Sequence, residues 1–70
     1  MSEEIEIEIN KLMKSLGFNQ NETVAMLLTF DAFECQHERT YFLEKLKNNE
    51  ITTQDHLGDY VRMIVRKYKK

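Results

Sequence analysis

Apolar residues recur along this chain at the three- and four-residue spacing of amphipathic helices. The first stripe predicts a helix from Ser2 to Leu16 with Ser2 as its N-cap, and the last predicts a helix from Asp55 to Lys70. The two stripes follow the same spacing: Ile5, Ile9, Leu12, Met13 and Leu16 in the first, and Leu57, Tyr60, Val61, Ile64, Val65 and Tyr68 in the last. We therefore expect these two helices to pack on one another, within one molecule or across a dimer.

The first helix contains a conflicting pattern. Residues 4–9 alternate strictly between glutamate and isoleucine, as a half-buried strand does. We predict a helix because no second alternating run is present to pair with this segment, and a lone strand is not stable. Ile7 then lies off the apolar stripe, which makes it a candidate contact for another chain.

The middle of the chain predicts two shorter helices. Asn19 followed by Glu22 is the pattern of a capping box, so a helix begins near Gln20; it carries Val24, Leu27 and Leu28 and ends near Asp31. The stripe Phe42, Leu43 and Leu46 fits a further helix from about Gln36 to Lys47. No helix breaker separates the two, so one long bent helix is the alternative. A compact core of this size favours two.

The connections rest on few turn residues, because the chain has no proline and two glycines. Gly17 stands where a left-handed C-terminal cap is required, Asn48 and Asn49 supply a turn, and Thr52 or Thr53 caps the last helix. Gly58, inside that helix, suggests close approach of another backbone. The expected fold is all-α: a small bundle of three to four short helices forming a single domain over residues 1–70.

Composition narrows the class of protein. Apolar residues make up 41% of the chain and charged residues 31%, which is too apolar for disorder, and no run approaches the roughly 20 residues of a membrane span. We therefore expect no membrane partner and a cytoplasmic location. The single cysteine, Cys35, excludes an internal disulfide and fits a reducing compartment.

The pattern of reactive residues predicts a protein that is not an enzyme. Cys35 and His37 form a lone C-x-H, whereas a zinc site needs three or four ligands, and His56 would join them only by folding. The two glycines are isolated, so no phosphate-binding loop or oxyanion hole is expected. We expect no catalytic residues, no metal and no cofactor.

These exclusions favour a protein-interaction module that acts as an adaptor, an inhibitor or a regulatory subunit and self-associates, for example as a dimer. Seven aromatic residues are generous for a core of this size. Phe30, Phe42 and Tyr60 are assigned to the core. Phe33 and Tyr41 flank the uncertain junction, where they would form an exposed aromatic patch, and exposed apolar patches mark partner surfaces. With Ile7, they are the predicted partner-binding residues.

The alternative is a nucleic-acid-binding regulator. The last ten residues hold five of the ten basic residues, which would contact phosphates: Arg62, Arg66, Lys67, Lys69 and Lys70. The net charge of −2 argues against a dedicated nucleic-acid binder. Basic residues at a helix C-terminus also complement the helix dipole, as do the four glutamates among the first ten residues at a helix N-terminus.

Two segments resemble parts of known families. Residues 9–18 and 41–46 are similar to the first helix with its loop and to the third helix of ubiquitin-associated domains, but the spacing between them is longer here and the last helix has no counterpart. Residues 16–27 resemble the opening helix of winged-helix regulators of the archaeal sugar-responsive type, whose recognition helix does not follow. Each resemblance covers less than half of the chain, so neither assigns a family.

Overall fold

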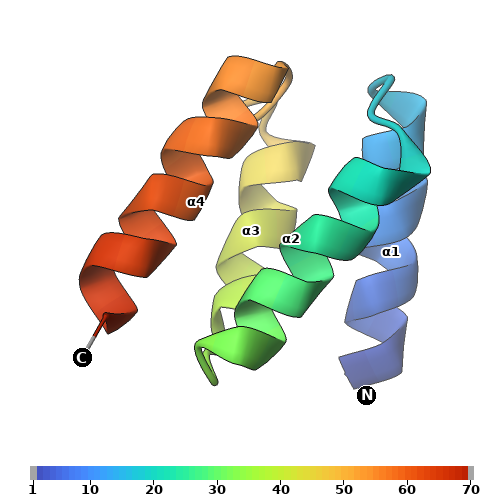
Figure 1. Cartoon of the computed structure of the whole chain (residues 1–70). Helices are drawn as coiled ribbons and strands as arrows, with labels where there is room; N and C mark the ends of the chain where they lie inside the picture. The colour runs from blue at the N-terminus through green and yellow to red at the C-terminus, as the bar shows by residue number, and fades with distance from the viewer. Residues whose placement is uncertain (1, 70) are drawn as a thin grey trace.

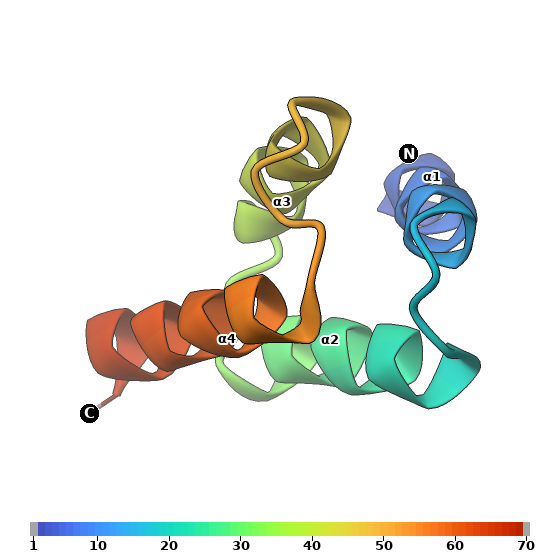
Figure 2. The ribbon, with the colours of Figure 1, turned by 90° about the horizontal axis from the view of Figure 1, so that it is seen from above.

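The computed structural model describes residues 2–69, and side chains from Glu3 onward. This part of the chain forms four helices and no strand: α1 (Ser2–Ser15), α2 (Gln20–Ala32), α3 (Glu38–Lys47) and α4 (Gln54–Tyr68). Successive helices run in opposite directions (Figure 1). Seen from above, α1 and α3 form one layer and α2 and α4 the other (Figure 2). The predicted all-α bundle is confirmed, and the middle of the chain is two helices.

All three connections begin with the same hydrogen-bonded turn. A residue with positive φ follows each of the first three helices: Gly17 (+96°), Glu34 (+53°) and Asn49 (+59°). Each donates its N–H to the carbonyl three residues back, and the next residue donates to the carbonyl five residues back, at 2.9–3.3 Å. These are the two bonds of a Schellman motif. Gly17 was predicted to play this role; Glu34 was not, because glutamate seldom adopts a left-handed conformation.

Side chains cap the starts of α2 and α4, whereas α3 begins after His37 without a side-chain cap. Asn19 Oδ1 accepts from the N–H of Glu22, and Glu22 Oε1 accepts from the N–H of Asn19, so the predicted capping box is confirmed. At α4 the cap is Thr53, whose hydroxyl accepts from the N–H of His56. The side chain of Ser2, predicted as the first cap, lies outside the described residues.

The core lies between the two layers and is aromatic at its centre. The rings of Phe30, Phe42 and Tyr60 pack with centroids 5.1–6.4 Å apart, as their assignment to the core predicted. Around them are buried apolar side chains from every helix: Ile9, Met13, Phe18, Met26, Cys35, Leu43, Leu46, Ile51, Leu57 and Ile64.

Two contacts considered in the sequence analysis do not form within one molecule. α1 packs against α3 and α2, while α4 lies on the far side of them, so the expected contact between the first and last helices does not form within one molecule (Figure 1). A Cβ atom at Gly58 would meet no atom within 4 Å, so this glycine does not serve close backbone approach. None of the helices in the described part has the length and apolarity needed to cross a membrane.

Candidate functional site

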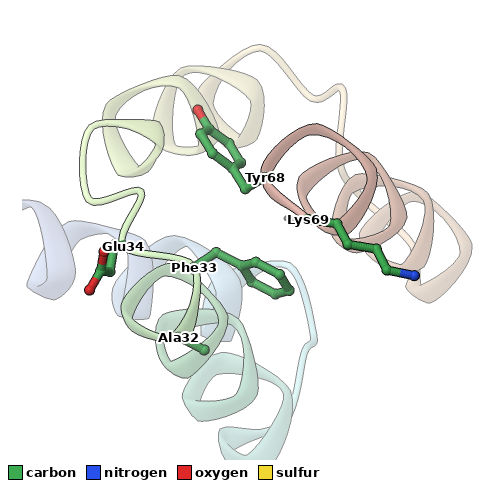
Figure 3. Close-up of a pocket in the computed structure, with 5 residues that line it drawn as sticks. All are labelled: Ala32, Phe33, Glu34, Tyr68 and Lys69. Carbon is green, nitrogen blue, oxygen red and sulfur yellow. The ribbon is translucent and has the colours of Figure 1, made fainter.

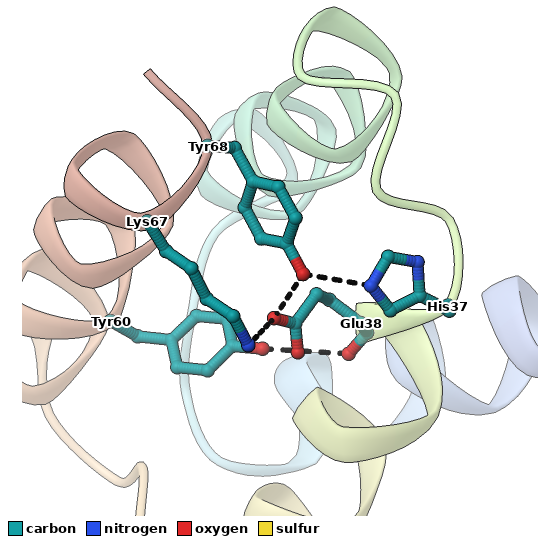
Figure 4. A network of polar contacts seen from close by, with 5 residues as sticks. All are labelled: His37, Glu38, Tyr60, Lys67 and Tyr68. Carbon is teal, nitrogen blue, oxygen red and sulfur yellow. Dashed lines mark hydrogen bonds and ion pairs between the residues drawn. The ribbon is translucent and has the colours of Figure 1, made fainter. Parts of the chain in front are cut away.

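A polar cluster joins the start of α3 to the end of α4 (Figure 4). The Glu38 side chain is only 4% exposed, and its Oε2 accepts from Tyr68 Oη at 2.8 Å and from Lys67 Nζ at 3.1 Å. His37 Nε2 lies 2.7 Å from Tyr68 Oη, and since that hydroxyl donates to Glu38, the histidine nitrogen donates to it. The hydroxyl of Tyr60 donates to the Glu38 carbonyl at 3.4 Å.

The electrostatics of this cluster favour a charged Glu38. Burial alone raises the pKa of its carboxyl group, but the hydrogen bonds from Tyr68 and Lys67 and the charge of Lys67 outweigh it and hold that pKa below its usual value. The hydrogen bond to Glu38 in turn raises the pKa of Lys67. Desolvation, followed by the bond to Glu38, raises the pKa of Tyr68, whose hydroxyl therefore stays protonated.

This arrangement acts as a clasp. The Tyr68 hydroxyl and the Lys67 ammonium hold the Glu38 carboxylate, the Tyr60 hydroxyl holds the Glu38 carbonyl, and the raised pKa of Tyr68 makes its oxygen a poor nucleophile. Cys35, next to the clasp in sequence, is fully buried, and desolvation raises the pKa of its thiol. The chemistry supported by these groups is anchoring of the α4 C-terminus on α3.

A second buried charged residue, Arg39, links α3 to α1 and α2. Arg39 on α3 is 5% exposed and pairs with Glu6 of α1 at 2.7 Å and with Asp31 of α2 at 3.1 Å. Its Nε has no hydrogen-bond partner within the described residues. Both carboxylates are partly exposed, so the pairs fix the positions of the helices without enclosing a ligand site.

The predicted anion-binding residues do not act as one set. Lys67 is bound to Glu38, and Arg62 pairs with Asp59 at 2.8 Å. Arg66 and Lys69 are exposed and form no ion pair with any other described residue. Lys70, the last member of the predicted set, lies outside the described residues.

The predicted partner-binding residues lie on different elements. Ile7 is 53% exposed on α1, and Tyr41 is 60% exposed on α3. Phe33, the C-cap residue of α2, is partly buried against the core and points into a hollow of about 320 Å³ that it shares with Ala32, Tyr68 and Lys69 (Figure 3). The aromatic pair expected of Phe33 and Tyr41 does not form, because Tyr41 stands on the solvent side of α3.

The structure shows an apolar ridge on α2 that the sequence analysis did not identify as exposed. The residues of α2 that are buried are Thr23, Met26 and Phe30, whereas Val24 is 43% and Leu28 59% exposed. Val24, Leu28 and Ala32 follow at four-residue intervals, so they line up along the exposed side of the helix. The signal was present in the sequence: α2 has more apolar residues than one helical stripe can hold.

The ridge continues onto α4 through the hollow of Figure 3. Ala32, Phe33 and Glu34 border that hollow on the α2 side, and Tyr68 and Lys69 border it on the α4 side. The carboxylate of Glu34 points away from Phe33 and Lys69 (Figure 3). Lys69 also borders a second hollow, on α4 alone, together with Val61, Val65, Arg62 and Arg66. We call this continuous surface the α2–α4 face: Val24, Leu28, Ala32, Phe33, Val61, Arg62, Val65, Arg66 and Lys69.

Comparison with known proteins gives no relative from which to assign this surface. No protein-family model, no curated protein and no solved structure matches the chain.

Proposed function

We propose that this protein is a small protein-interaction module, acting as an adaptor, an inhibitor or a regulatory subunit, and that the α2–α4 face is its contact surface. The observation that supports this is the exposure of Leu28 and Val24 on a helix whose opposite side is fully used in the core. Burying one fully exposed leucine or valine contributes about 1.5–3 kcal/mol, and these two are each about half exposed, so a partner that covers both gains roughly that much in total.

Ile7 and Tyr41, which are also exposed, are weaker candidates for a contact surface. Ile7 and Tyr41 each stand alone on their helices, and single exposed apolar residues are ordinary on protein surfaces. On the α2–α4 face, by contrast, three apolar residues are aligned on α2 and two more, Val61 and Val65, lie one turn apart on α4. Contiguity is what distinguishes a contact patch from scattered exposure.

A substitution on the ridge tests the proposal. Leu28→Lys is expected to remain folded, since Leu28 is exposed, and to lose the partner that the unaltered chain captures from a lysate of its native cells. Ile7→Lys and Tyr41→Lys are the matched controls, with similar exposure on other helices. Circular dichroism verifies folding. Retention of the partner by Leu28→Lys, or its loss in a control variant instead, contradicts the assignment of the face.

Self-association is measured separately. Sedimentation velocity from about 10 µM to about 1 mM reports whether the partner is a second copy. A dimer that Leu28→Lys disrupts supports the face as a homodimer contact. A strictly monomeric protein that also captures nothing from its lysate contradicts the proposed function as a whole.

Nucleic-acid binding is the second candidate, and one observation favours it: Arg66 and Lys69 are exposed cations that form no ion pair within the described residues. Two phosphate contacts predict a shallow salt dependence, with a slope of about −1.8 in log K against log salt. The test is a gel shift at low salt that compares the unaltered chain with the double variant Arg66→Glu, Lys69→Glu. Lys67 is left unchanged, because its removal would disturb Glu38. Equal retention by both proteins rules this candidate out.

A further inference from the structure

The two edges of the α2–α4 face differ in charge. Along α2 the exposed ridge is uncharged: Val24, Leu28 and Ala32. Along α4 the two valines are bordered by Arg62, Arg66 and Lys69. The face is therefore apolar on one side and basic on the other, and a complementary partner is apolar in the middle and acidic along one side only.

The two edges also match in length and direction. Val24 to Ala32 on α2, and Val61 to Lys69 at the end of α4, are each eight residue steps long, or about 12 Å at the rise of an α-helix. α2 and α4 run in the same direction in the same layer of the bundle (Figures 1 and 2). The hollow between Phe33 and Lys69 joins the C-terminal ends of the two helices. A helix bound across this hollow would meet both apolar rows with its own apolar residues at three- and four-residue spacing.

From this juxtaposition we infer that the partner of the α2–α4 face is an amphipathic helix of another protein with glutamate or aspartate along the flank that meets α4. This inference rests on the proposed function and specifies the partner's chemistry. The apolar residues of the partner contact Leu28 and Val65, and its carboxylates pair with Arg66 and Lys69.

A second copy of the chain fits the face less well. A two-fold axis across the helices would bring Arg62, Arg66 and Lys69 of one copy against those of the other, and like charges disfavour that contact. A two-fold axis along the helices would place these cations on the uncharged α2 ridge of the other copy, which offers them no carboxylate. The acidic helix of this chain, α1, is partly engaged, since Glu6 pairs with Arg39 and Glu8 with Lys47 at 3.5 Å. Nucleic acid would pair with the cations but leave the α2 ridge exposed.

Two synthetic helical peptides of 18 residues test the inference. They share one leucine stripe, and they differ in having glutamate or lysine along one flank. Each is titrated into the ¹⁵N-labelled full chain and followed by amide chemical shifts. The glutamate peptide is expected to bind at least tenfold more tightly than the lysine peptide, with the largest shifts in α2 and the second half of α4. The double variant Arg66→Glu, Lys69→Glu is expected to reverse this preference, and Lys14→Glu on α1 to leave it unchanged.

The outcomes separate this inference from the proposed function. Equal affinity for the two peptides, no saturation by the glutamate peptide at about 1 mM, or shifts centred on Ile7 or Tyr41 overturns the acidic helical partner. A DNA duplex that shifts the same amides more strongly than the glutamate peptide overturns it as well. If lysate capture still depends on Leu28 in any of these cases, the interaction function stands and only the chemistry of its partner is wrong.

Discussion

Neutralising Glu38 should release the clasp between α3 and α4, in a way that depends on pH. The substitution Glu38→Gln keeps the shape of the side chain and removes its charge. Two donors, Tyr68 Oη at 2.8 Å and Lys67 Nζ at 3.1 Å, then face a neutral amide. Hydrogen bonds to charged groups contribute about 1.5–3 kcal/mol each, and the neutral amide retains part of that. Solvent screens the exposed ammonium of Lys67, so we expect a total loss of about 1–3 kcal/mol at pH 7.

The direction of the pH dependence follows from the lowered pKa of Glu38. A carboxyl group whose pKa is lower in the folded protein than in the unfolded chain stabilises the fold above the unfolded value, 4.5. That stabilisation is lost as the pH falls through the folded pKa, because both states are then protonated. The difference between Glu38→Gln and the unaltered chain should accordingly be full at pH 7 and shrink as the pH falls below 4.5.

Urea unfolding followed by circular dichroism at 222 nm, at pH 7 and at pH 3, measures this difference. Glu44→Gln is the control, because Glu44 is exposed on the same helix and forms no ion pair within the described residues. A loss for Glu38→Gln that is equal at both pH values would show that the clasp is not an ionic one. A loss no larger than that of Glu44→Gln would refute the clasp altogether.

Three further outcomes are expected. Gly58→Ala should stabilise the protein by about 0.5–1 kcal/mol, since a Cβ there meets nothing, and Gly17→Ala should destabilise it because of its φ of +96°; opposite shifts in thermal midpoint check both. Phe30→Ala should cost about 3–5 kcal/mol of the roughly 4–10 kcal/mol available to a chain of this size, so its helical circular dichroism should be largely lost at 37 °C. Cys35 should react with a thiol reagent only as fast as the chain unfolds, because the thiol is buried with a raised pKa; reaction in native buffer as fast as in urea would contradict this.

Local signals explain how much of the fold could be predicted. The Asn19–Glu22 capping box, the left-handed Gly17 and the Thr53 cap are settled by residues within a few positions of each other, and all three form as predicted. The division between α2 and α3 rests on Glu34, a residue whose type does not signal a turn. Its left-handed conformation is maintained by the turn hydrogen bonds and by the burial of Cys35 after it.

The candidate site was much less accessible to prediction. Hydrophobicity along α2 does not distinguish Val24 and Leu28 from Met26 and Phe30, and only the position of α2 against its neighbours decides which pair is buried. Likewise, the basic residues of α4 form one run in the sequence. Only the packing of α3 against α4 decides that Lys67 pairs with Glu38, while Arg66 and Lys69 form no ion pair among the described residues.

The sequence by itself determined that this protein is a set of short helices and where the capped helices α2 and α4 begin, because helix formation and capping are local. The tertiary structure alone decided which apolar residues of α2 face water, that α1 packs on α3 and not on α4, and which cations remain for a partner. Those features depend on contacts between residues about 30 positions apart in sequence, such as Glu38 with Lys67 and Tyr68. The geometry of such contacts is set by how the helices pack, and no local pattern encodes it.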